Sequence, residues 1–215
     1  MVDVLTLSAQ LSQEFCEPTE PPFEYEIIVN QPRLCELVIR GAGLMLINKF
    51  RRAIFRYVET VAIDVVNIEI NSSVIPDESV AHRLGLIPIK LDSDLCDCKA
   101  NENCDGCKIP FTLEAIGDLP YKREITSEDI IFEGDCHVIG ISPFILQYLH
   151  PGERICLRGF VKKGRGCEHI KWCPGSGISF KEIGPHTFRF RFENSGQLSN
   201  EEILKQGLLA LIRHK

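Results

Sequence analysis

Four cysteines lie close together in the segment DLCDCKANENCDGC, where they form the pattern C-x-C-x5-C-x2-C. They are Cys96, Cys98, Cys104 and Cys107. Four thiolates on a short loop can complete the tetrahedral shell of one zinc ion, and the last pair has the spacing of a zinc knuckle, with Gly106 easing the turn. The flanking Asp94, Asp97 and Asp105 would leave a cluster of unliganded thiols strongly negative, and a divalent cation removes part of that charge. The pattern therefore predicts a loop that holds one structural zinc ion (Zn2+).

Two other interpretations of the four cysteines stay open. An iron–sulfur cluster also takes four thiolates, and free or redox-active thiols need no metal. A thioredoxin-like motif is disfavoured because Cys104 and Cys107 do not open a helix after a strand. A second, looser group contains Cys167, His169 and Cys173. It offers only three ligands, so thiols without a metal are the favoured interpretation there.

The composition is that of a globular protein. The chain has 215 residues, of which 44% are hydrophobic and 25% charged, which is enough for one large domain or two small ones. The 24 basic and 30 acidic residues give a net charge of −6. An acidic chain does not have the basic surface needed to coat nucleic acid.

The beginning of the chain predicts a flexible lead-in over residues 1–23, which is acidic and proline-rich towards its end. It shows no basic region before an apolar run, so no secretory signal is expected. The apolar stretches are too short to cross a bilayer, which needs about 20 residues. We therefore expect no membrane contact and a reducing compartment, cytosolic or nuclear.

Hydrophobic periodicity predicts two long helices near the two ends of the chain, with mostly strand-like sequence between them. This order favours an α+β protein in which an αβ layer is closed by both ends and carries a β-rich insertion. The expected strands cover residues 25–29, 34–39, 61–70, 155–161 and 188–192, and the expected helices cover residues 43–58, 77–85 and 200–213.

The last helix has a strong apolar face. Ser199 is placed to cap it, with Glu202 three residues on. Leu204, Leu208 and Leu211 repeat at helical spacing. Such a face must be buried, either in the chain's own core or against a helix of a partner.

Several segments resemble the α-like subunits of multisubunit RNA polymerases. The most specific is Ala81–Pro88, with the sequence AHRLGLIP, which follows the similar segment NSSVIPDE at Asn71–Glu78. The NKFRR helix segment at Asn48–Arg52, the EHIKW segment at Glu168–Trp172 and the end of the chain from Phe188 are also similar to this family. Within the family, the cysteine loop points to the third-largest subunit of RNA polymerase II.

The chain departs from the family pattern in three ways. Five residues separate Cys98 from Cys104, where the family loop has three. The chain passes quickly from Trp172 to Phe188, where the family often carries an insertion. The lysine that opens the K-E-H motif is Cys167 here. The result resembles a pared-down version of the subunit, of the kind a reduced or viral genome encodes.

The resemblance implies a two-domain fold. A discontinuous dimerisation domain is expected over residues 24–60 and 184–215. A β-rich insert domain is expected over residues 61–183, with its zinc loop at residues 94–108.

The resemblance also implies a role without catalytic residues. Such subunits nucleate polymerase assembly by pairing with a smaller α-like subunit, and they recruit the second-largest subunit and small zinc-bearing subunits. Nucleic acid is then met only through the complex, in the nucleus or, for a viral protein, in a virus factory or virion. The terminal leucines would lie outside a self-contained core until the partner covers them. The implied partner-binding residues are Phe50, Arg51, Arg52, Leu204, Leu208 and Leu211.

Two hypotheses from other classes remain beside this one. The stretch 151–195 carries nine bases and four acids, so the chain is alternatively an independent zinc-containing nucleic-acid-binding module. The acidic total and the lack of interleaved aromatic and basic residues speak against it. A thiol enzyme is the weaker third hypothesis, and it requires thiols that stay reactive after metal loading.

Overall fold

The computed structural model describes residues 22–92, 108–118 and 120–213. The chain divides into two compact units. The first unit comprises the chain up to Thr60 and again from Arg165 to its end, and the second comprises Val61–Gly164. Within the described ranges, no helix is long and apolar enough to cross a membrane.

The first unit contains a four-stranded antiparallel sheet with the strand order β1-β2-β12-β11. The inner strands are β2 (Leu34–Arg40) and β12 (Thr187–Asn194), and the edge strands are β1 (Glu24–Gln31) and β11 (Gly175–Gly184). The two inner strands come from opposite ends of the sequence, and Phe190 pairs with Leu37. Because strands from the two ends of the chain pair with each other, this unit is discontinuous in sequence. This agrees with the predicted αβ layer that both ends of the chain close.

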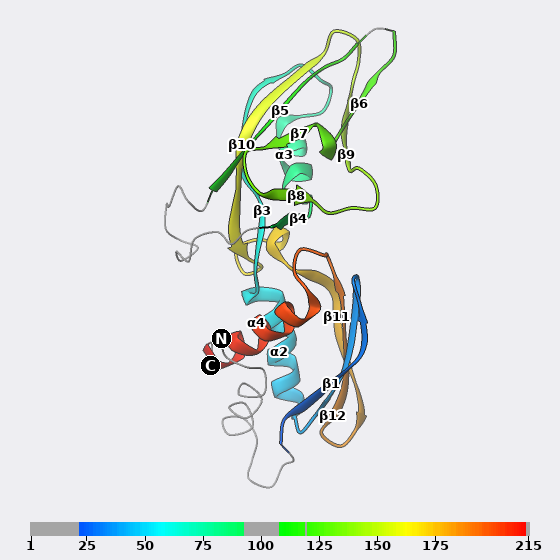
Figure 1. Cartoon of the computed structure of the whole chain (residues 1–215), viewed down its shortest axis with the longest axis vertical. Helices are drawn as coiled ribbons and strands as arrows, with labels where there is room; N and C mark the ends of the chain where they lie inside the picture. The colour runs from blue at the N-terminus through cyan, green and yellow to red at the C-terminus, as the bar shows by residue number, and fades with distance from the viewer. Residues whose placement is uncertain (1–21, 93–107, 119, 214–215) are drawn as a thin grey trace. The chain divides into compact units, whose positions relative to one another are not determined.

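Two helices, α2 (Leu44–Tyr57) and α4 (Asn200–Arg213), lie beside each other over one face of this sheet (Figure 1). Alternate residues of β12 are buried, which directs its phenylalanines towards the helices. The Phe50 and Phe190 rings have centroids 5.1 Å apart, which ties α2 to the sheet. The core of this unit includes Leu37, Ile39, Ile47, Phe50, Ile54, Phe188, Phe190, Phe192, Ile203, Leu204, Leu208 and Leu211.

The second unit is built around a four-stranded sheet with the order β3-β10-β5-β7 and two small two-stranded sheets. Strand β5 alternates between buried and exposed residues over its whole length, as a half-buried strand should. Its inward side chains Phe111 and Leu113 join Leu84 of α3 and Leu157 of β10 in a separate hydrophobic core. The elements are β3 (Glu59–Asn71), α3 (Asp77–Gly85), β4 (Ile89–Leu91), β5 (Lys108–Ile116), β6 (Arg123–Thr126), a 3-10 turn (Ser127–Asp129), β7 (Ile130–Phe132), β8 (Cys136–Val138), β9 (Ile145–Leu149) and β10 (Arg154–Arg165).

The structure confirms a mixed α+β protein made mostly of sheets and moves one predicted boundary. The second division falls between Gly164 and Arg165 and not at residues 183/184. The reason is that β11 pairs with β12 and so belongs to the sheet of the first unit. Residues 94–107 of the cysteine loop predicted at residues 94–108, and nearly all of the lead-in, lie outside the described residues, while Lys108 begins β5.

Candidate protein-interaction sites

The apolar face of α4 is covered by the chain itself. Leu204, Leu208 and Leu211 are at most 4% exposed, and Phe50 is 2% exposed. All four belong to one core cluster with α2 and the sheet. The expectation that these leucines lie outside a self-contained core until a partner covers them is therefore corrected, because α2 and the sheet of the same unit already bury them.

The outward face of α2 is different. Leu44 and Met45 at its start are 61% and 75% exposed, and Phe55 near its end is 39% exposed. Exposed apolar side chains that follow one helix face are typical of a surface covered by another protein.

The predicted arginine pair divides between two roles. The Arg51 guanidinium donates from Nε and Nη2 to the Asn48 Oδ1 atom, at 3.2 and 3.1 Å, so it is held along the helix. Arg52 is exposed, and within the described residues no carboxylate pairs with it. Arg52 is therefore the member of the pair that is available to an acidic partner.

The segment that contains Glu168 to Trp172 is structural. Trp172 is 5% exposed, and its carbonyl accepts a 2.7 Å hydrogen bond from the Thr60 hydroxyl. The His169 Nδ1 atom accepts from the Lys171 backbone N–H at 3.1 Å and so caps the turn over Ile170–Trp172. Its recognisable sequence therefore fixes the local fold.

The second cysteine group, Cys167, His169 and Cys173, lies within the described residues. Among the described residues, no group of three metal-ligating side chains comes together. The Cys173 thiol donates to the Gly175 carbonyl at 3.0 Å, and burial raises the pKa of this thiol. The interpretation of this group as thiols without a metal stays a prediction.

The segment NSSVIPDE also builds the fold. The Asn71 side chain donates to the Ile75 carbonyl at 2.9 Å and to Asp77 Oδ1 at 2.7 Å. The Ser73 hydroxyl donates to the Oε1 atom of Gln147, a fully buried side chain, at 2.9 Å. The helix cap is Pro76, so Asp77 lies in the first turn, where its carboxylate still suits the helix dipole.

Five of the nine basic residues in the stretch 151–195 pair with carboxylates. Arg154 pairs with Glu114 and Arg158 with Glu69, both at 2.6 Å. Three further pairs are Lys162 with Asp64, Arg165 with Glu59, and Arg191 with Glu193. Guanidinium groups held by carboxylates present no continuous positive surface to a phosphate backbone, so this stretch does not favour the nucleic-acid-binding hypothesis.

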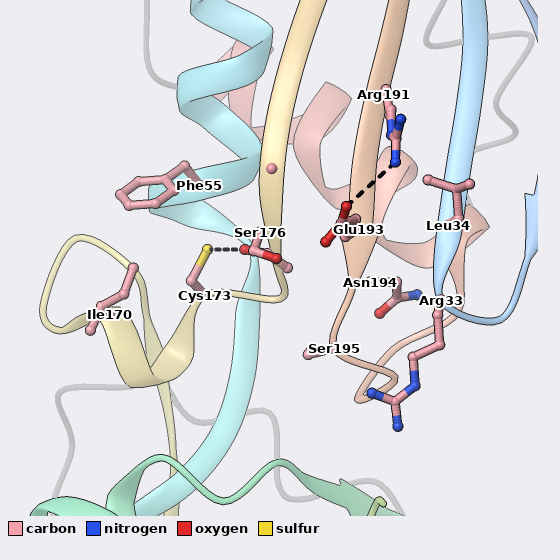
Figure 2. Close-up of a pocket in the computed structure, with 12 residues that line it drawn as sticks. Arg33, Leu34, Phe55, Ile170, Cys173, Ser176, Arg191, Glu193, Asn194 and Ser195 are labelled. Carbon is pink, nitrogen blue, oxygen red and sulfur yellow. Dashed lines mark hydrogen bonds and ion pairs between the residues drawn. The ribbon is translucent and has the colours of Figure 1, made fainter. Parts of the chain in front are cut away.

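One open pocket of about 720 Å³ in the first unit was not anticipated from the sequence. Figure 2 shows Phe55 and Ile170 on one side of it and Arg33, Leu34 and Arg191 on the other. Cys173, Ser176, Glu193, Asn194 and Ser195 lie between the two sides (Figure 2). The residues come from four separate stretches of sequence, so no local motif could have indicated the pocket.

These observations define a class: a two-unit α+β chain whose recognisable motifs build the fold and whose helix α2 exposes apolar side chains on its outer face. A model of the RNA polymerase Rpb3/RpoA insert domain matches residues 66–173, half of the chain. The chain therefore belongs to the RNA polymerase Rpb3/RpoA insert-domain family.

The curated relatives carry matching names. The DNA-directed RNA polymerase II subunit rpb3 of Dictyostelium discoideum is 32% identical over 179 residues, which cover 76% of this chain and 59% of the relative. RPB3 of Schizosaccharomyces pombe is 33% identical over 68% of this chain and 55% of its own length. The archaeal subunit Rpo3 of Archaeoglobus fulgidus is 32% identical over 74% and 61%. The chain spans just over half of the length of these relatives.

Proposed function

We propose that the chain is a non-catalytic assembly subunit of a multisubunit DNA-dependent RNA polymerase. The observation that carries this proposal is the family match over residues 66–173, together with relatives that are named as polymerase subunits. The relatives with RNA polymerase II names favour a nuclear location for a cellular protein.

The partner in this proposal is a smaller α-like subunit that packs on the outer faces of α2 and α4. Leu44 and Met45 supply exposed apolar area on α2, and half-buried Leu209 and Ile212 supply it on α4. Burial of such side chains drives association, and aliphatic anchors surrounded by charged residues are typical of interface centres. The buried leucines then support the interface from behind by fixing α4 against α2.

The second-largest subunit and small zinc-bearing subunits would join the platform that this heterodimer forms. Arg52 is the candidate contact for an acidic group on one of them, because its guanidinium has no carboxylate partner within the described residues.

The zinc proposal rests on the donor set, since the four cysteines lie outside the described residues. Strands β4 and β5 flank the loop, and Ile89 and Ile109 at its two ends belong to the same hydrophobic core. A polar loop anchored at both ends in one core would be stiffened by a closed four-thiolate zinc site. Cys96, Cys98, Cys104 and Cys107 would hold the ion, which would act structurally.

Affinity purification of the tagged chain from its native source tests the assembly role. Recovery of two large polymerase subunits and a small α-like protein, identified by mass spectrometry, is the expected result. The Met45→Asp variant should recover at least about tenfold less of the small protein, because it buries a charge at the interface. Val74→Asp serves as the matched control, since Val74 is 82% exposed in the second unit. Recovery of the chain alone at low salt would contradict the proposal.

Metal analysis tests the zinc site. The purified chain should contain one zinc ion, and the double variant Cys104→Ser with Cys107→Ser should contain none. Cys156→Ser, which changes a thiol on β10 that donates a hydrogen bond to the Glu69 carboxylate on β3, should retain the metal. Full zinc content in the double variant would exclude the four-cysteine site.

A further inference from the structure

The pocket lined by Phe55, Ile170, Leu34 and Arg33 does not include Leu44 or Met45, the α2 residues assigned to the heterodimer above, and Phe55 lies near the other end of that helix. We propose that this pocket, called here the Arg33–Phe55 pocket, binds a short segment of a protein partner in which a bulky apolar side chain neighbours an acidic one. The proposal does not depend on which polymerase the chain serves, and it concerns a surface separate from Met45.

The apolar part of the pocket fits the bulky side chain. Ile170 is 52% exposed and Phe55 is 39% exposed, while Leu34 opposite them is half-buried. Figure 2 shows Phe55 and Ile170 along one side of the pocket and Leu34 on the other, and apolar side chains of a bound segment would cover part of this exposed area. Removal of this apolar area from water would favour binding.

The charged part of the pocket fits a carboxylate. Arg191 already has acidic neighbours, with Glu193 at 3.4 Å and Glu36 at 3.8 Å. Arg33 lies in the turn between β1 and β2, and no side chain in the described part of the chain pairs with its guanidinium. The pocket therefore has one uncompensated positive charge, which selects a partner with an acidic residue beside its apolar anchor.

Hydrogen bonds within the chain fix the walls of the pocket in the absence of a partner. The Ser195 hydroxyl donates to the Pro174 carbonyl at 2.7 Å, and the Asn194 backbone N–H donates to the Arg33 carbonyl at 3.1 Å. A side chain at position 175 would lie 2.2 Å from the Glu193 carbonyl oxygen, so Gly175 allows β11 to approach β12. A site with fixed walls loses little conformational entropy when it binds a short segment.

The same features disfavour nucleic acid as the occupant. A phosphate backbone would meet the Glu193 carboxylate in the wall, and the chain as a whole has a net charge of −6. An open pocket of about 720 Å³ with one apolar and one cationic side also suits a peptide of several residues.

Selection of random short peptides, displayed on phage, against the intact chain tests the proposal. Enriched peptides should combine an aromatic or aliphatic residue with Asp or Glu. Their affinities, measured by fluorescence polarisation, should fall at least about tenfold in Arg33→Glu and in Ile170→Asp. The matched controls are Arg189→Glu on β12 and Ile183→Asp on β11, which change exposed residues of the same sheet outside the pocket.

Each other outcome overturns the proposal. These outcomes are no enrichment over a chain that carries both Arg33→Glu and Ile170→Asp, enrichment of basic peptides, and binding that the controls weaken as much as the pocket variants do. Competition by single-stranded oligonucleotide with the same Arg33 dependence would assign the pocket to nucleic acid instead. Copurification of the small α-like subunit should be unchanged in Arg33→Glu, so failure of this proposal is distinguishable from failure of the assembly role.

Discussion

Gly207 lies where α4 contacts α2, and any side chain at this position would collide with α2. An added Cβ would lie 2.7 Å from Ile54 Cγ1 and 3.1 Å from Phe50 Cε2. Overpacking of this kind costs about 1–3 kcal/mol. Replacement of glycine by valine also gains less in helix propensity than replacement by alanine would. We expect Gly207→Val to lower the free energy of unfolding by about 2 kcal/mol. Lys205→Val should change it by about 0.5 kcal/mol or less, since Lys205 is not in the core. Equal effects in urea denaturation would contradict the close approach.

The thiol of Cys35 makes stability depend on alkaline pH. Burial, and then the nearby Glu36 carboxylate, raise its pKa from 9.0 to about 11. Below pH 9.0 the thiol is neutral in both states, so its contribution is fully present. Between pH 9.0 and about 11 the unfolded chain loses the proton and the folded chain keeps it, so stability falls as pH rises.

The Cys35→Ala variant separates this contribution from those of other groups. It should be less stable at neutral pH because it leaves a cavity, but it should lose less stability than the wild type between pH 9 and about 11. Denaturation at a series of pH values measures the difference. Parallel curves for the two proteins would show that Cys35 does not titrate in this range.

At the scale of elements, the start of α4 is fixed by a buried amide network. The Asn200 side chain donates to Asn30 Oδ1 at 2.7 Å and to the Gln31 carbonyl at 2.9 Å. Its own oxygen accepts from the Asn194 amide at 2.8 Å. These bonds join the helix to the end of β1 and to the end of β12.

Asn200→Asp should break this network. The carboxylate cannot donate, and it would face two oxygens that then lack a partner. We expect a loss of about 2–3 kcal/mol in the free energy of unfolding, although an acidic residue at a helix start normally stabilises it. Asn67→Asp on the exposed face of β3 should be nearly neutral. A neutral effect at position 200 would show that another donor replaces the amide.

The same element shows what sequence could and could not predict. The predicted α4 at residues 200–213 agrees with the structure, since its apolar spacing is regular and the Ser199 hydroxyl accepts from the Glu202 N–H at 3.2 Å. Strand β11 was missed because it contains three glycines and two irregularities in its pairing. Tertiary structure decides which element packs against the leucine-rich face of a helix. The spacing of Leu204 and Leu208 could therefore not show that α2 covers them. The Arg33–Phe55 pocket could not be predicted from the sequence for the same reason.

At the scale of the whole molecule, each unit has its own hydrophobic core. One cluster includes Phe190 and Leu208, both from the first unit, and the other includes Phe111 and Leu157, both from the second. Because each cluster draws its residues from one unit, damage to one core should leave the other folded.

Leu208→Asp tests this independence. Leu208 is 1% exposed, so the substitution buries an unpaired charge and should unfold the first unit. Hydrogen exchange followed by mass spectrometry should then show lost protection in β2 and β12, with β5 and β10 protected as in the wild type. Phe111→Ala should give the reverse pattern, since it empties space in the core of the second unit, and should cost about 3–5 kcal/mol there. Loss of protection in both units of either variant would mean that the chain unfolds as one cooperative structure. Unfolding of one unit would then have to be transmitted to the other through β3 and β10, the two strands in which the chain passes between the units.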